Sequence, residues 1–122
     1  LAPSGVAGDA FVAGILHDLG ELVIAAMPPS PDPSPMLHAR AAALLLGLWG
    51  LPPELVTAVA FHHDPAGAPS PADPTLRALA LAELLTAELE APDEVSPVPH
   101  ELATPSELAE HRRLARDAWQ KR

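Results

Sequence analysis

Apolar residues recur at intervals of three and four along most of the chain, and nowhere is a strict alternation with polar residues sustained. This spacing predicts helices rather than strands. In the first helix, expected over residues 8–26, the core-facing stripe comprises Phe11, Ile15, Leu19, Leu22, Val23 and Ala26. Trp49, at the end of the second helix, is also expected in the core.

The 16 prolines gather between these apolar segments, where they favour helix boundaries. They separate five predicted helices, which cover about residues 8–26, 36–49, 52–63, 74–89 and 104–122. Asp73 is the expected N-cap of the fourth helix, and Thr104 opens a Thr-x-x-Glu capping box in the fifth. Gly50 suits the C′ position of the second helix. We therefore predict an all-α bundle of about five helices, with a stiff proline loop at 28–35.

Composition narrows the classes of protein to which the chain can belong. Its 122 residues include no cysteine, which excludes disulfide frameworks and thiolate sites and fits a reducing cytoplasm. Strictly apolar runs, such as residues 41–46, are no longer than six residues, whereas a membrane-spanning helix needs about 20 residues. We expect a soluble cytoplasmic domain. Because the chain opens on leucine, we also expect it to be part of a longer polypeptide.

The charges are distributed unevenly. Residues 1–110 hold 15 acidic and two basic residues, whereas residues 111–122 hold five basic residues and one acidic residue. Binding to nucleic acid depends on clustered lysine and arginine, so the acidic body argues against such a ligand. The short basic tail has little aromatic content and is expected to be a solvated helix end.

Histidines and carboxylates provide the candidate chemistry, because together they are the usual ligands of Zn, Mn or Fe. The candidate metal ligands are His17, Asp18, His38, His62, His63 and Glu83. His17 and Asp18 are neighbours in the first predicted helix, and Gly14 and Gly20 on either side would allow a close approach. Glu83 has apolar neighbours on its helix, so its carboxylate needs a partner, a proton, a metal or the rim of a cleft.

Each of these side chains also has an explanation that involves no metal. His17 and Asp18 can form a buried hydrogen-bonded pair between two helices, and His38 can be a core histidine whose hydrogen bonds are satisfied. The paired histidines after the third helix suit the negative end of the helix dipole. The carboxylate of the fourth helix can extend to solvent.

Three motifs follow one another within residues 8–90: His-Asp-Leu-Gly at 17–20, Leu-Trp-Gly-Leu-Pro at 48–52 and His-His at 62–63. Their order, with His38 between the first two, resembles the HD superfamily. More narrowly, it resembles the HDOD type, the HD-related output domain of bacterial signalling proteins. The resemblance implies the C-terminal portion of an HD-like helical domain over residues 1–103, followed by an amphipathic helix over residues 104–122.

Active HD phosphohydrolases hold one or two divalent metals, and a metal-bound hydroxide attacks phosphorus. The resemblance implies Zn, Mn, Fe or Mg bound by His17, Asp18, His38, His62 and His63, with Glu83 in place of the family's aspartate. In an active enzyme, His17 and Asp18 would be the catalytic pair.

The chain departs from the active members in several places. Glu21 stands where many have a lysine, the histidine of an upstream helix is absent, and the extended glycine motif after His63 is missing. HDOD proteins generally lack a full ligand set and act through protein contacts. The leading hypothesis is a non-catalytic output domain that binds a protein partner, a neighbouring signalling domain or a second copy. The alternative is a metal-dependent phosphohydrolase of nucleotides or cyclic dinucleotides, and an intermediate possibility is a bound metal without turnover.

Overall fold

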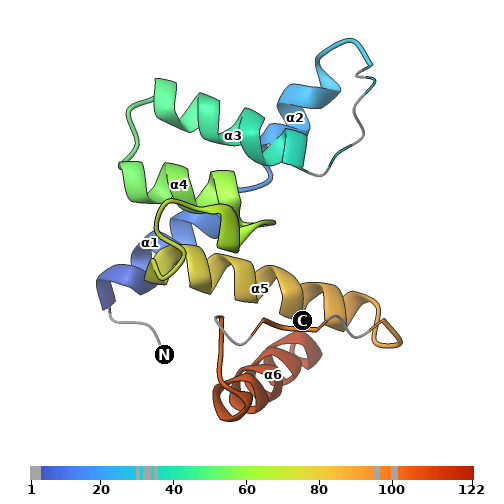
Figure 1. The fold of residues 1–122 in the computed structure, drawn as a ribbon. Helices are drawn as coiled ribbons and strands as arrows, with labels where there is room; N and C mark the ends of the chain where they lie inside the picture. The colour runs from blue at the N-terminus through green and yellow to red at the C-terminus, as the bar shows by residue number, and fades with distance from the viewer. Residues whose placement is uncertain (1–3, 30, 32–33, 35, 95–96, 100–101) are drawn as a thin grey trace. The chain divides into compact units, whose positions relative to one another are not determined.

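The computed structural model describes residues 4–29, 31, 34, 36–94, 97–99 and 102–122. Their regular structure is entirely helical (Figure 1), with α1 (Ser4–Leu16), α2 (Leu19–Ala25), α3 (Met36–Leu48), α4 (Pro53–Phe61), the 3₁₀ helix η1 (Pro65–Gly67), α5 (Pro74–Glu90) and α6 (Pro105–Gln120). The predicted all-α fold is confirmed. None of these helices is both long enough and apolar enough to cross a membrane. Within the predicted proline loop, positions 30, 32, 33 and 35 lie outside the described residues.

Two predicted N-terminal caps are present. Asp73 precedes α5, and its Oδ1 accepts a hydrogen bond of 3.0 Å from the Leu76 amide. At α6 the Glu107 amide donates to Thr104 Oγ1 at 3.3 Å, while the Thr104 amide donates to Glu107 Oε2 at 2.8 Å. Both arrangements satisfy amides that the first turn of a helix leaves without a backbone partner.

The predicted C′ glycine ends α3 in a Schellman motif. Gly50 has a φ of 76°, in the left-handed region that favours glycine. Its amide donates to the Gly47 carbonyl at 3.1 Å, and the Leu51 amide donates to the Leu46 carbonyl at 3.1 Å. These two bonds satisfy carbonyls in the last turn and direct the chain toward α4.

The predicted first helix over residues 8–26 is wrong in one respect, because the chain turns at His17 and Asp18 and forms two helices. The His17 amide still bonds to the Ala13 carbonyl at 2.8 Å, whereas the Asp18 carbonyl accepts the Glu21 amide of the next helix at 2.9 Å. The turn interrupts the phase of the apolar stripe that a single helix would present.

The predicted core positions of this segment change accordingly. Phe11, Ile15 and Leu22 are 69%, 64% and 70% exposed, while Ala13 is fully buried in the core. Trp49 is 60% exposed, so its predicted place in the core is also wrong. On α1, Ala13 is the buried residue, and the half-buried Leu16 packs against the core beside it.

Residues 1–79 and 80–122 form two compact units. In the first, α3 packs against α2 and α4, and α4 also contacts α1 (Figure 1). The core of this unit consists of Ala13, Ala42, Leu46, Leu55, Ala58, Val59, Ala68, Leu76 and Leu79. In the second, Leu81 and Leu85 of α5 are buried with Ala103, and Val98 and Leu108 pack against them. The predicted boundary at residue 103 stays a prediction, because a division by contacts does not test where an HD-like domain ends.

At Gly20, α2 approaches the backbone of α3 closely. A Cβ atom on Gly20 would lie only 2.7 Å from the His38 carbonyl carbon and 2.9 Å from the Ala42 nitrogen. The close approach expected at Gly20 is therefore present, and α3 is what approaches it. Gly14, by contrast, has open space where a Cβ would be.

Candidate metal site

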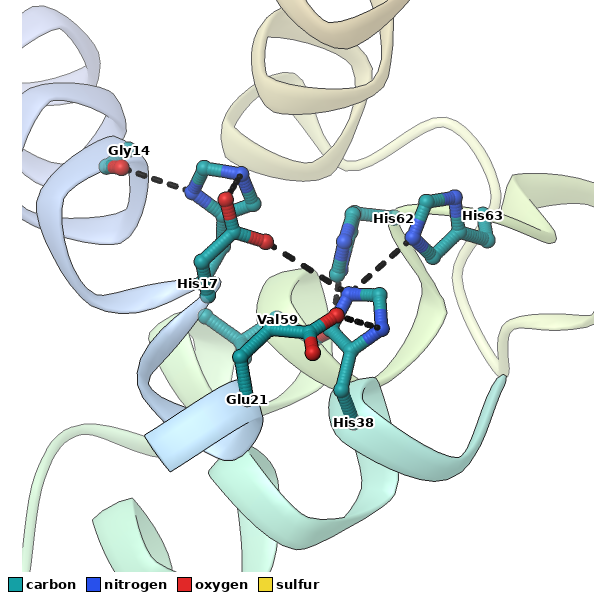
Figure 2. A network of polar contacts seen from close by, with 8 residues as sticks. Gly14, His17, Glu21, His38, Val59, His62 and His63 are labelled. Carbon is teal, nitrogen blue, oxygen red and sulfur yellow. Dashed lines mark hydrogen bonds and ion pairs between the residues drawn. The ribbon is translucent and has the colours of Figure 1, made fainter. Parts of the chain in front are cut away.

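Four imidazoles from three parts of the first unit come together (Figure 2). His17 lies in the turn between α1 and α2, His38 in the first turn of α3, and His62 and His63 directly after α4. The ring centroid of His62 lies 5.1 Å from that of His17, 5.4 Å from that of His38 and 4.1 Å from that of His63. His38 and His63 are 4.9 Å apart by the same measure.

The cluster is buried on one side and open on the other. His38 and His62 are only 7% and 3% exposed, whereas His63 is exposed. The side chains of Asp18 and Glu21 are 61% and 62% exposed. The buried imidazoles are thus held firmly by packing, while the carboxylates and His63 face solvent, from which an ion or a small ligand can enter.

In three of the histidines, Nδ1 lies close to an oxygen, which is a hydrogen-bonded backbone carbonyl for His17 and His62 and an ion-paired carboxylate for His38. His17 Nδ1 lies 2.6 Å from the Gly14 carbonyl oxygen, and His62 Nδ1 lies 2.6 Å from the carbonyl oxygen of Val59. His38 Nδ1 lies 3.2 Å from Glu21 Oε1. Because a carbonyl or an ionised carboxylate only accepts, these contacts favour the tautomer with the proton on Nδ1, in which Nε2 is the atom that can bind a metal.

The Nε2 atoms and the Asp18 carboxylate lie close to one another. His38 Nε2 is 3.2 Å from His63 Nε2 and 3.5 Å from Asp18 Oδ1, and His17 Nε2 is 3.2 Å from Asp18 Oδ2. Two imidazole nitrogens that share one tetrahedral Zn²⁺ lie about 3.3 Å apart, given Zn–N bonds of about 2.0–2.1 Å. The separation between His38 and His63 therefore fits two ligands of one ion.

Two overlapping groups of side chains can hold an ion. One comprises His38, His62 and His63, and the other His17, Asp18 and His62, with the ligand atoms of each group within 4.8 Å of one another. The donors are mostly imidazole nitrogens, which suit Zn, Mn and Fe, whereas Mg prefers oxygen. Of the metals that the sequence suggests, Mg fits this donor set least well.

Five of the six predicted ligands are thus brought together, although His17 and Asp18 occupy a turn and not the predicted helix. Glu83 is half-buried on α5, in the second unit, and belongs to neither group of ligands found among the described residues. Its role as a ligand stays a prediction.

Sequence reasoning missed Glu21 as a residue of the site. A glutamate at this position suggested only the loss of the positive charge of the lysine that many active members have there. A signal was available, since Glu21 follows Asp18 by three residues and so lies one helical turn away.

No known protein family matches the chain, and no solved structure matches it. An uncharacterized protein of Treponema pallidum (strain Nichols) is 25% identical to this chain, in a match that covers 77% of this chain and 22% of the relative. The chain therefore spans about a fifth of the length of the relative that it matches.

Proposed function

We propose that this chain is a cytoplasmic regulatory domain of the HDOD type that binds a divalent transition metal in its histidine cluster. Its output is a contact with a protein partner or with a neighbouring signalling domain. The observation that carries the proposal is the shared orientation of His17, His38 and His62. In each, Nδ1 lies within 3.2 Å of an oxygen, and this orientation favours Nε2 as the atom that binds a metal.

A protein partner is supported by apolar side chains at the surface of the first unit. On and just after α3, Leu44, Leu48 and Trp49 are 68%, 76% and 60% exposed. Large apolar side chains that gather at a surface favour protein contacts, since water solvates them poorly. The motifs that resemble HDOD proteins support the same role.

The charges beside the cluster support binding without turnover. Asp18 and Glu21 contribute two negative charges, which one divalent ion would neutralise. No net positive charge would then remain to attract a phosphate ester, and the acidic body would repel it. One bound ion therefore suits a structural or sensing role.

The alternative is a metal-dependent phosphohydrolase, and the position of Asp18 between the histidines of the two ligand groups favours it, although Nε2 of His62 can bind an ion of only one group. The two oxygens of Asp18 also face different histidines, Oδ2 toward His17 and Oδ1 toward His38. Two ions in these groups would leave a positive site. When bound, they would supply an activated water for attack on phosphorus.

Metal analysis of protein purified without chelator tests the proposal. We expect about one equivalent of Zn, Mn or Fe per chain, lost in the double variant His17→Ala, Asp18→Ala. The matched control is His111→Ala, which removes an imidazole that bonds to the Glu107 carbonyl on α6. Protein that contains no stoichiometric metal would contradict the proposed site.

A phosphodiesterase assay on cyclic dinucleotides then separates the two candidate functions. We expect no turnover by the metal-loaded chain. Turnover that disappears in the double variant, together with two equivalents of metal, would favour the phosphohydrolase. Deletion of this segment should change the output of its signalling pathway, and an unchanged output would contradict the regulatory role.

A further inference from the structure

Glu21 links the site to the packing of α2 against α3. It lies in the first turn of α2, next to Gly20, whose missing side chain lets the two helices approach. From there its Oε1 lies 3.2 Å from Nδ1 of His38, a buried residue in the first turn of α3. The backbone on both sides of this contact is therefore held in place.

His38 needs an acceptor that its own helix cannot supply. His17 and His62 follow the last turn of a helix, where carbonyls without helical partners are available, and each bonds to the carbonyl three residues before it. His38 lies at the other end of a helix, where the available backbone groups are amides, and amides only donate. The carboxylate of Glu21, in ion-pair contact with Nδ1 at 3.2 Å, offers an acceptor within reach.

We infer that Glu21 is a positioning residue of the metal site. It holds His38 in the tautomer with the proton on Nδ1 and thereby makes Nε2 the ligand atom. The inference rests on the proposed metal site and adds to it the residue that selects the metal-binding tautomer of His38. A lysine at this position could only donate, so it could not hold that tautomer. Glutamate at position 21 therefore favours binding of a metal, whereas a lysine there would favour binding of a phosphate.

A graded set of variants tests the inference by Zn²⁺ affinity. The metal-depleted 122-residue chain is titrated with Zn²⁺ against a chromophoric chelator. Loss of an outer carboxylate costs about 10- to 100-fold in metal affinity, and we expect such a loss for Glu21→Ala. Glu21→Gln keeps a neutral acceptor and should lose less. Glu54→Gln is the control, because Glu54 is an exposed glutamate in the first turn of α4.

The outcomes separate the inference from the proposed function. Unchanged affinity in Glu21→Ala would overturn the role of Glu21 and leave the metal site standing. A wild-type chain that binds no Zn²⁺ would overturn both. Equal losses in Glu21→Ala and Glu54→Gln would assign the effect to net charge and overturn the positioning role.

The tautomer of His38 provides a readout that needs no metal. In ¹⁵N spectra of the metal-free wild type at mildly alkaline pH, we expect the His38 proton on Nδ1, and this population should fall in Glu21→Ala. The His62 tautomer, held by the Val59 carbonyl, should not change and serves as the internal control. A His38 proton that stays on Nδ1 in Glu21→Ala would contradict the inference.

Discussion

The second unit buries a carboxylate together with its own cation, whereas the contacts in the first unit join imidazoles to carboxylates and to one another. Arg112 on α6 donates from Nε and Nη2 to the two oxygens of Glu88 at 2.9 and 2.6 Å. The Glu88 side chain is 13% exposed and that of Arg112 is 31% exposed. In the first unit, two imidazole Nε2 atoms instead face each other at 3.2 Å.

The difference distinguishes a stabilising pair from a binding site. In the bidentate pair of Arg112 and Glu88, donors and acceptors match in number and direction, so the pair needs no further ligand. Facing Nε2 atoms at 3.2 Å either share a proton in a hydrogen bond or, when both are unprotonated, can bind the same cation. The first arrangement should contribute to stability, and the second should contribute to binding.

The largest effect is expected where the site depends on helix packing. Gly20→Ala would place a Cβ against the His38 carbonyl, and backbone atoms cannot rotate away as a side chain can. We expect a loss of stability of at least about 3 kcal/mol, at the upper end of the range for overpacked cores. Because the turn before Gly20 and the residue after it supply Asp18 and Glu21, Zn²⁺ affinity should fall as well. Urea denaturation and Zn²⁺ titration measure the two effects.

Gly14→Ala is the matched control, with the same change one turn before the site. Open space surrounds that position, and alanine favours a helix over glycine by up to about 1 kcal/mol. We expect unchanged or slightly higher stability and unchanged Zn²⁺ affinity. Equal damage from both substitutions would show that close contact between α2 and α3 does not hold the site.

These two glycines also illustrate how far the sequence reaches. Caps such as Asp73, Thr104 and Gly50 could be predicted, because each depends on bonds within a few residues. The turn at His17 could not, since it depends on where α3 and α4 provide packing surfaces. For the same reason Phe11 is exposed although its spacing suits a core stripe.

The candidate site divides in the same way. The sequence suggested which histidines lie together, because the order of the motifs can be read from the sequence alone. The pairing of Glu21 with His38 requires two helices to approach at Gly20, and helical periodicity within one segment does not encode such a contact.

A smaller effect is expected when the pair of Arg112 and Glu88 in the second unit is broken. Arg112→Ala would leave the Glu88 carboxylate largely buried without its fork of donors. Because Arg112 is partly exposed, we expect a loss of about 1–3 kcal/mol, between the values for surface and buried pairs. Zn²⁺ affinity should not change. Urea denaturation of the metal-depleted chain measures the loss.

Two further variants show whether the loss comes from the buried charge. Arg113→Ala removes an exposed pair with Asp117 and should cost no more than about 0.5 kcal/mol. Adding Glu88→Leu to Arg112→Ala should restore part of the stability, because the unpaired carboxylate is gone. Losses of equal size from Arg112→Ala and Arg113→Ala would contradict the comparison between the two units.

The smallest expected effect is the pH dependence of the stability that the pair of Glu88 and Arg112 contributes. Hydrogen bonds from Arg112 hold the pKa of Glu88 below its ordinary value of about 4.5, although burial opposes this. When folding lowers the pKa of a carboxyl group, the charged group adds stability at pH values above its ordinary pKa. This stability is lost as the pH falls through the lowered pKa. The stability difference between wild type and Glu88→Gln should therefore be constant from pH 7 to about 5 and shrink below about 4.5. Metal-depleted protein is needed for the measurement, because protons also compete with metal for imidazoles. A difference that persists unchanged at pH 3 would mean that the charge of Glu88 contributes nothing, and that the second unit is held at this point by packing alone.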